Sequence, residues 1–226
     1  MSRLIDLSVS LGHPDLAVVP NFPPVEYWRF HEHATHGRQN SAVKMAIHQG
    51  THIDAPSHFV NGGTDIDEMP LETFCGRAVK IDMRANIKFG NPITRKIIEA
   101  SAGFDPKRLD GSIAVSWTGW AEKSILLPAY YETNPFLDKE ACNFLCDCGI
   151  KALCMDHPID PGVTPDFVPD KEDCPGHRTV LGRGVPLIEH VINLETFEEA
   201  EFEMFAFPIK CYKLEGAPVR VVARVG

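Results

Sequence analysis

Residues 48–58 read HQGTHIDAPSH and hold three histidines and one aspartate within eleven positions. The glycine and the proline in this stretch oppose a helix, because they are the two poorest helix formers. We therefore expect extended chain, in which alternate side chains share one face. His48, His52 and Asp54 then point the same way, and two imidazoles beside a carboxylate are typical ligands of a divalent cation.

The spacing of these residues also requires a bend. Four residues of strand span roughly 13 Å, about the longest distance that two imidazoles could bridge to one ion. Gly50 allows the chain to bend between His48 and His52, and it leaves room beside a metal. His58 follows Asp54 by four residues, close enough to act on whatever the ion holds. The competing interpretation is three unrelated surface histidines and a turn aspartate, but so dense a group of ligand types is rare outside metal-binding segments.

The composition limits the classes of protein to consider. The chain has 226 residues, of which 44% are hydrophobic, so it can bury a full core, and we expect one domain over residues 1–226. A net charge of −9 makes nucleic acid and anionic membrane surfaces poor partners. The first six residues reach an acid before any apolar run, and no stretch is apolar over the roughly 20 residues of a membrane span. We interpret the seven cysteines as reduced thiols of a cytoplasmic protein.

Hydrophobic patterning and turn residues predict an α/β domain that is rich in β-structure and has flanking helices. Strands are predicted over residues 4–11, 25–30, 41–48, 77–83, 112–117, 151–155, 185–188, 202–211 and 218–225. Helices are predicted over residues 91–102, with Pro92 near the start, and over residues 137–149, with Gly149 as the cap. Residues 13–24 and 156–173 are rich in proline and are expected to be irregular.

The pattern His-x-Gly-Thr-His-x-Asp-x-Pro-x-His resembles the signature of the cyclase-like metal hydrolases, a family that includes bacterial kynurenine formamidase and isatin hydrolase. Every signature position is matched, by His48, Gly50, Thr51, His52, Asp54, Pro56 and His58. The resemblance continues in IDLS at residues 5–8, in IDEMPLETFCGRAVKIDM, and in GVPLIEHVINLETF and FAFPIKCYKLEGAPVRVVA, so it covers nearly the whole chain. It implies a compact fold of the swivelling β/β/α type that assembles as a homodimer or homotetramer.

The resemblance implies that His48, His52 and Asp54 hold a divalent ion, Zn²⁺ or Mn²⁺, and that His58 transfers protons. A bound ion of this kind lowers the pKa of its water to about 7, and His58 could pass the proton to a leaving nitrogen. The expected activity is hydrolysis of a C–N bond in a small amide, formamide or cyclic amide, and no G-x-S-x-G elbow offers a serine route. The alternatives are a metal-dependent lyase or cyclase on a small carbonyl substrate, and a non-catalytic metal-binding protein.

His177 and Glu189 stand twelve residues apart, where the resemblance places the ligands of a second ion bridged by Asp54. Isatin hydrolase resembles a one-ion design with glutamine near the position of Glu189, so one or two ions per chain are both left open. The residues themselves favour a paired or metal-bound Glu189, because VPLIEHVINL puts this acid inside an apolar segment. Ordinary surface polarity is the alternative for both residues.

Three aromatic residues are candidates to line an apolar substrate pocket, although any of them could be plain core: Phe22, Trp28 and Trp120. Family formamidases tend to carry a tryptophan just before the proline of the N-terminal loop, where this chain has Val19, and often a serine within residues 155–162, which is missing here. These differences lie where substrate choice would be made, so N-formylkynurenine itself is left open. The stretch HEHATH at residues 31–36 lacks zincin spacing. A polar loop is favoured there, with a lid over the site as the alternative.

Overall fold

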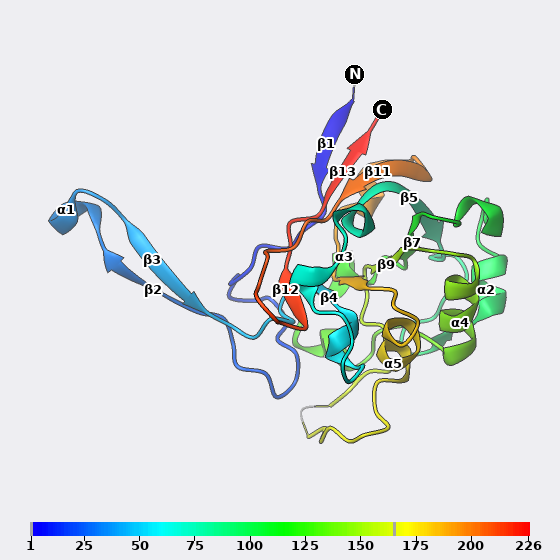
Figure 1. Ribbon diagram of the computed structural model, residues 1–226, viewed down its shortest axis with the longest axis horizontal. Coiled ribbons are helices and arrows are strands. Elements are labelled where there is room, and N and C mark those ends of the chain that lie inside the picture. Colours follow the sequence, from blue (N-terminus) through cyan, green and yellow to red (C-terminus); the bar gives the residue numbers. More distant parts are fainter. Residues whose placement is uncertain (1, 165) are drawn as a thin grey trace.

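The computed structural model describes residues 2–164 and 166–226, and its centre is a nine-stranded mixed sheet. The strand order is β1-β13-β11-β5-β7-β9-β10-β4-β12. The bounds are β1 Arg3–Asp6, β4 His52–Asp54, β5 Cys75–Asp82, β7 Ile113–Trp117, β9 Ala152–Met155, β10 Leu187–Glu189, β11 Glu201–Phe205, β12 Gly216–Pro218 and β13 Val222–Val225. The central strands β5, β7, β9 and β10 run parallel, and the outer pairs are antiparallel. The two termini lie side by side because β1 pairs with β13 (Figure 1).

The sheet separates two hydrophobic cores. Alternate residues of β7 face opposite ways, so Ile113 and Val115 join one core while Ala114 joins the other. Three helices cover the second face, and they are α2 Arg95–Glu99, α4 Lys139–Asp147 and α5 Pro175–Leu181. A further short helix, α3 Trp120–Ser124, follows β7. The α/β architecture expected from the sequence, rich in strands and with few helices, is confirmed.

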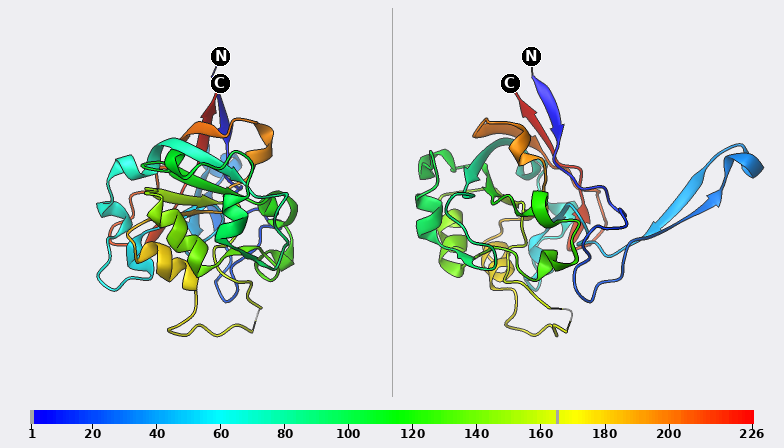
Figure 2. Two further views of the ribbon diagram at one scale, coloured as in Figure 1. Left: turned by 90° about the vertical axis from the view of Figure 1, so that its right-hand side faces the viewer. Right: turned by 180° about the vertical axis from the view of Figure 1, so that it is seen from behind.

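Two strands leave this body as an arm. β2 Glu26–His31 and β3 Asn40–Lys44 pair with each other in an antiparallel two-stranded sheet, and the one-turn helix α1 His33–His36 joins them at the tip. Figures 1 and 2 show the arm, residues 25–44, projecting far from the body. A second small sheet pairs β6 Pro92–Ile93 with β8 Phe136–Leu137. No helix in the described part of the chain is long and apolar enough to cross a membrane.

The helix predicted over residues 91–102 is wrong at its start. Pro92 and Ile93 belong to β6, and the helix begins only after Thr94, whose hydroxyl accepts a hydrogen bond of 3.4 Å from the N–H of Ile97. The proline is therefore a strand residue rather than the first residue of a helix. The helix predicted over residues 137–149 is confirmed as α4, where Asp138 caps the start by accepting from the N–H of Ala141 at 2.7 Å.

Several strands are shorter than their apolar patterns predicted. The strand expected over residues 4–11 ends at Asp6. Just beyond it, the hydroxyl of Ser8 accepts a hydrogen bond of 2.7 Å from the N–H of Val221, so a side chain replaces the backbone carbonyl that would continue the strand pairing. The strand expected over residues 202–211 ends at Phe205, and Pro208 beyond it makes only an isolated bridge. The strand expected over residues 41–48 ends at Lys44, before the metal-ligand motif starts.

Candidate functional site

The histidine-rich motif bends as its spacing requires. Gly50 has a φ of +61°, and β4 begins two residues later. His48 Nδ1 lies 2.6 Å from Asp54 Oδ1, and His52 Nε2 lies 3.1 Å from the same oxygen, so the expected convergence of the three side chains is confirmed. The expectation that Gly50 leaves room beside a metal is wrong. A Cβ at this position would lie 3.0 Å from the side chain of Val9, so the missing side chain makes room for the apolar core instead.

Strand pairing brings Glu189 to the motif. β10 runs antiparallel to β4 with Glu189 directly opposite His52, and opposite residues of an antiparallel pair share a face. Glu189 Oε2 lies 3.7 Å from His52 Nε2, and Oε1 accepts a hydrogen bond of 3.2 Å from the N–H of Ile159. The side chain is almost fully buried. Glu189 is therefore a paired carboxylate inside the molecule, as its apolar surroundings predicted, and surface polarity does not account for it.

His177 reaches the same point from α5. Its Nε2 lies 3.3 Å from Asp54 Oδ2 and 3.9 Å from Glu189 Oε2. Its Nδ1 is hydrogen-bonded to Asp160, which also accepts from the N–H of Gly176 at 2.6 Å and so caps the start of α5. Asp160 thereby turns the imidazole so that Nε2 faces the two buried carboxylates. A metal-binding histidine is usually oriented in this way by a carboxylate on its other nitrogen.

Asp54 is the common member of these contacts. Its side chain is fully buried, and among the described residues its Oδ2 makes no hydrogen bond, because the 3.3 Å contact with His177 Nε2 lacks the geometry of one. It belongs to one group of possible ligands with His48 and His58 and to another with His177 and Glu189, and the donor atoms in each group lie within 4.8 Å of one another. Imidazole nitrogens and carboxylate oxygens around an unsatisfied, buried oxygen fit divalent ions with Asp54 between them.

The electrostatics of the cluster agree with this fit. Burial alone would raise the pKa of Asp54, but the imidazoles of His52, His48 and His177 hold it well below its usual range, so the carboxylate is ionised and able to bind a cation. Burial lowers the pKa of His52, but the carboxylates of Asp54 and Glu189 raise it overall. The cluster therefore concentrates negative charge where imidazole nitrogens converge.

His58 lies beside this cluster on the 3₁₀ turn Pro56–His58 that follows β4. Its ring stacks on the ring of His48 with a centroid distance of 3.9 Å, and it lies 5.7 Å from the ring of His177. Burial lowers the pKa of His58 to about 3, so the imidazole is neutral at neutral pH. The structure thus brings His58 to the ligand group, as its spacing after Asp54 predicted.

A cavity of about 410 Å³ opens above these residues. Its floor carries the ligand-type side chains, and its walls are mostly apolar, formed by Val19, Pro20, Phe22, Phe59, Pro158, Pro161, Val163, Phe167 and Pro169. The N-terminal loop and the 156–173 excursion meet over it, where Asn21 Nδ2 donates to the carbonyl of Phe167 at 2.7 Å. A site of this size, apolar with a few convergent polar groups, suits a small aromatic ligand.

The three aromatic candidates for the pocket have different places. Phe22 lines the cavity, with its ring centroid 6.5 Å from that of His48. Trp28 lies on the arm and is 51% exposed, and Trp120 is buried in a third core, where its Nε1 donates to the carbonyl of Tyr130 at 3.1 Å. Neither tryptophan is among the described residues that line the cavity. The segment HEHATH ends in α1 at the tip of the arm, so it does not cover the site of its own chain (Figure 1).

The structure adds residues that the sequence reasoning missed. Besides Asp160, the cavity is lined by Tyr131, Asn134, Cys174 and His190. The buried His190 directly follows Glu189, and its Nδ1 lies 2.8 Å from the hydroxyl of Tyr130. It faces the site because its φ of +63° breaks the alternation of β10. A strand pattern would have pointed it away, and only its place beside an acid in an apolar segment hinted at a role.

Comparison with known proteins agrees with this geometry. The family model described as "Putative cyclase" matches residues 5–159. The chain belongs to the Cyclase family. A kynurenine formamidase from Bacillus cereus is 30% identical to this chain over 225 residues. The match covers 99% of this chain and 98% of the relative.

Solved structures of the same fold extend the comparison. Isatin hydrolase A from Ralstonia solanacearum has a TM-score of 0.83 at 21% identity, covering 100% of this chain and 92% of its own. Isatin hydrolase A from Labrenzia aggregata, bound to benzyl benzoate, has a TM-score of 0.82 at 26% identity, covering 99% and 94%. The cyclase-like fold that the motif implied is therefore confirmed for this chain.

Proposed function

We propose that this Cyclase-family chain hydrolyses a C–N bond in a small aromatic formamide or cyclic amide, with one or two Zn²⁺ or Mn²⁺ ions. The observation that carries the proposal is the ionised, fully buried Asp54, surrounded by imidazoles at the floor of an apolar cavity. A kynurenine formamidase similar over nearly the whole chain, and isatin hydrolases that share its fold, support this class of substrate.

The chain offers ligands for two ions. His48, His52 and Asp54 would hold the first, and His177 and Glu189 would hold the second from the opposite side of Asp54. A divalent ion held here would activate a water at neutral pH and polarise a carbonyl oxygen. A mixture of imidazole and carboxylate ligands suits Zn²⁺ and Mn²⁺.

His58 would move the proton of the reaction. It lines the cavity and is neutral at neutral pH, so its free nitrogen would take a proton from the attacking water. The same imidazole would then give this proton to the nitrogen that leaves as the C–N bond breaks. Stacking on His48 holds the ring next to the reacting atoms throughout.

The walls of the cavity would select the ring of the substrate. Phe22 from the N-terminal loop and Phe59 beside His58 line the same space, and the chain joins this loop to the opposite wall through Asn21. These surfaces would exclude water and offer flat contacts to an aromatic ring. All seven cysteines of the chain are unpaired thiols, which supports the cytoplasm as the compartment.

The test is a panel of N-formyl anilines, including N-formylkynurenine, together with isatin and simple aliphatic amides. Purified protein is assayed before and after chelation, and then with Zn²⁺ or Mn²⁺ added back. We expect hydrolysis of one of the aromatic classes, loss of this activity on chelation, and recovery with metal. Undiminished turnover by metal-free protein, or a preference for aliphatic amides, would contradict the proposal.

A further inference from the structure

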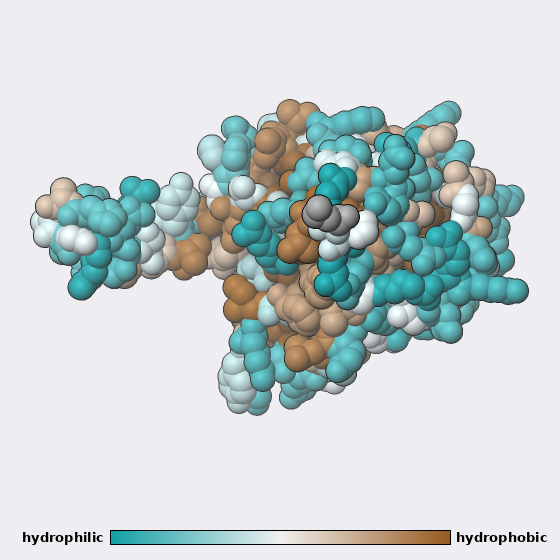
Figure 3. All heavy atoms as spheres, turned by 90° about the horizontal axis from the view of Figure 1, so that it is seen from above, coloured by the Kyte–Doolittle hydropathy of each residue, from teal (hydrophilic) through white to brown (hydrophobic). Residues whose placement is uncertain are grey.

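Two adjacent tyrosines near the cavity have no part in the reaction proposed above. Tyr130 and Tyr131 end the 3₁₀ turn Pro128–Tyr131, and both side chains are buried. The other two tyrosines of the chain, Tyr27 and Tyr212, are 65% and 77% exposed. Tyr27 belongs to the arm, which Figure 3 shows standing away from the body. A phenol hydroxyl in the interior needs a hydrogen-bond partner, so the buried pair marks a polar place in a mostly apolar wall.

Both buried hydroxyls meet the imidazole of His190. The hydroxyl of Tyr130 lies 2.8 Å from Nδ1, and the hydroxyl of Tyr131 lies 3.3 Å from Nε2. Nε2 is also the nitrogen nearer the acid, at 3.7 Å from Glu189 Oε2. A neutral imidazole has one N–H and one accepting nitrogen, and the acid favours the tautomer with its proton on Nε2. Tyr130 therefore donates to Nδ1, and the N–H at Nε2 faces Tyr131.

This arrangement leaves the proton of Tyr131 free. Its oxygen accepts from His190, which is the one hydrogen-bond partner of this hydroxyl among the described residues. A protonated imidazole would donate from both nitrogens, so it would leave the same proton free. Burial raises the pKa of Tyr131, and the carboxylates of Glu189 and Asp54 add to this, so the phenol keeps its proton at neutral pH. Tyr131 lines the cavity, and it thus offers a hydrogen-bond donor beside the metal-ligand cluster.

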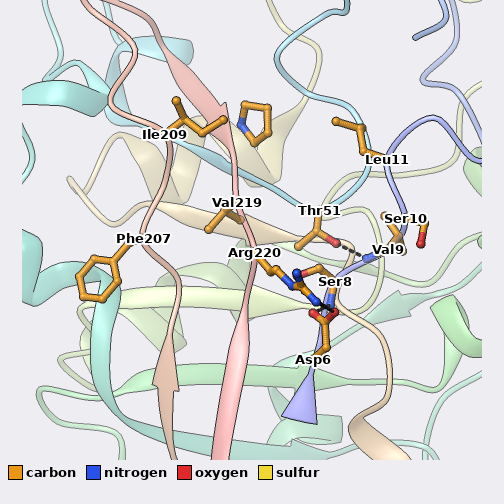
Figure 4. Close-up of a pocket in the computed structure, with 11 residues that line it drawn as sticks. Asp6, Ser8, Val9, Ser10, Leu11, Thr51, Phe207, Ile209, Val219 and Arg220 are labelled. Carbon is orange, nitrogen blue, oxygen red and sulfur yellow. Dashed lines mark hydrogen bonds and ion pairs between the residues drawn. The ribbon is translucent and has the colours of Figure 1, made fainter. Parts of the chain in front are cut away.

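The backbone holds the ring of His190 in this place. A φ of +63° is uncommon for a residue other than glycine, and it persists only where the surroundings fix it. The hydroxyl of Thr51 donates to the carbonyl of His190 and accepts from the N–H of Val9, both at 2.9 Å, and Figure 4 shows the second of these contacts. The next N–H along the chain, that of Val191, donates to the carbonyl of Met155 at 3.1 Å. The histidine motif and β9 together fix the turn.

The turn that carries Tyr131 is held as firmly. Its carbonyl accepts from the N–H of Val163 at 2.7 Å. Gly162 passes so close that a Cβ there would lie 3.2 Å from the same oxygen and would overlap the carbonyl oxygen of Glu132. The turn is therefore bound to the 156–173 excursion, which forms much of the cavity wall. A donor fixed at both its backbone and its hydroxyl needs little reorganisation to meet a ligand.

We propose that the hydroxyl of Tyr131 donates a hydrogen bond to the carbonyl oxygen of the bound amide, and that His190 orients this hydroxyl. The inference rests on the proposed hydrolysis for the class of substrate. Attack of water on the carbonyl carbon places negative charge on the oxygen, and a donor already aimed at that oxygen stabilises the transition state. The proton stays on the phenol oxygen throughout, so His58 keeps the proton transfer. His190 acts through Tyr131 and is a positioning residue.

The first test removes one hydroxyl from the metal-loaded enzyme. Tyr131→Phe keeps the ring, and we expect kcat for the preferred amide to fall by about 100-fold. KM, metal content and melting temperature should stay near those of the wild-type protein, because the hydrogen bond strengthens only as charge develops. Tyr212→Phe, which removes an exposed hydroxyl, is the matched control and should keep full activity. A kcat of Tyr131→Phe equal to that of the control, or loss of metal from this variant, would overturn the proposal.

The second test concerns the positioning role of His190. Asparagine tolerates a positive φ, but its side chain is too short to bridge two hydroxyls, so His190→Asn removes the contacts and keeps the turn. We expect this change to lower kcat in the wild-type background and to alter it little in the Tyr131→Phe background, because the two residues act as one unit. Equal losses in both backgrounds would show that His190 does not act through Tyr131.

Infrared spectroscopy tests the hydrogen bond without turnover. Acetophenone labelled with ¹³C at its carbonyl has no C–N bond, so it stays intact when bound to the protein, as purified or chelated. We expect its C=O stretch at lower frequency in the wild-type protein and Tyr212→Phe than in Tyr131→Phe, with His190→Asn between them. Equal frequencies in the wild-type protein and Tyr131→Phe, or a ketone that does not bind, would overturn the proposal. A clear difference in a protein that hydrolyses no amide would support the donor and contradict the hydrolysis alone.

Discussion

Replacing Asp54 by asparagine is the perturbation with the clearest expected consequence. The carboxylate belongs to two of the four groups of possible ligands among the described residues, and its two oxygens lie 2.6, 3.1 and 3.3 Å from nitrogens of His48, His52 and His177. Asparagine has the same shape but no charge, and its amide nitrogen would point a hydrogen-bond donor at one of these imidazoles. Asp54→Asn should therefore abolish binding of both ions, whereas a change at any other ligand should affect one ion.

The size of the effect follows from binding linkage. An ion at 100 times its dissociation constant adds about 2.7 kcal/mol to the free energy of unfolding. For a chain of about 150–250 residues, 1 kcal/mol shifts the melting temperature by about 2–4 °C. Each ion should thus raise the Tm of the wild-type protein by about 5–10 °C, and the rise should be absent in Asp54→Asn.

The assay is calorimetry of metal-free protein with and without added ion. Mn²⁺ is used beside Zn²⁺, because the seven thiols of the unfolded chain would bind Zn²⁺ and mask part of the effect. Asp156→Asn is the matched control, since Asp156 is equally buried but accepts from Thr118 and Gly119 instead of imidazoles. The control should keep the full metal-induced rise. An equal rise in Asp54→Asn, or none in the wild-type protein, would refute the reasoning.

Three further changes separate the roles of the remaining residues. His58→Ala should lower kcat by about 10²–10⁴ with metal content unchanged, and loss of metal along with activity would make His58 a ligand instead. Glu189→Gln should lower the metal content from about two ions per chain to about one and leave part of the activity, which elemental analysis and the amide assay check together. Asp156→Asn should lower the free energy of unfolding by about 1–3 kcal/mol, measured by urea titration. The reason is that the new amide donor of the asparagine would face the N–H groups at the start of α3. If the free energy of unfolding falls no further than in the variant Asp147→Asn, where the replaced residue is exposed, this reasoning is contradicted.

The first ligand group could be predicted from the sequence because it is local. His48, His52 and Asp54 lie within seven positions, and the period of extended chain with one glycine bend is enough to bring them together. The position of Glu189 was harder to predict from the sequence, because its place opposite His52 depends on the pairing register of two strands that are far apart in the chain. Its apolar neighbours nevertheless showed that this acid must be paired.

The rest of the site could not be read from patterns. Asp160 lies in an irregular, proline-rich segment, and its role depends on where α5 starts, a helix that no periodic run announced. His190 faces the cavity through a positive φ that strand alternation does not predict. The two strands of the arm could be predicted from their own residues. Their departure from the body could not, because it depends on a lack of packing partners among the described residues. This is also why Trp28 was expected near the substrate and is found on the arm.

The central claim is that a metal-activated water cleaves the C–N bond, and isotope labelling tests it most directly. The preferred substrate from the amide panel is turned over in H₂¹⁸O, and the carboxylic acid or formate product is analysed by mass spectrometry, with chelated protein as the blank. The account predicts one ¹⁸O atom in the acid product and no product from chelated protein. A product that forms without ¹⁸O, by cyclisation or elimination, would contradict it.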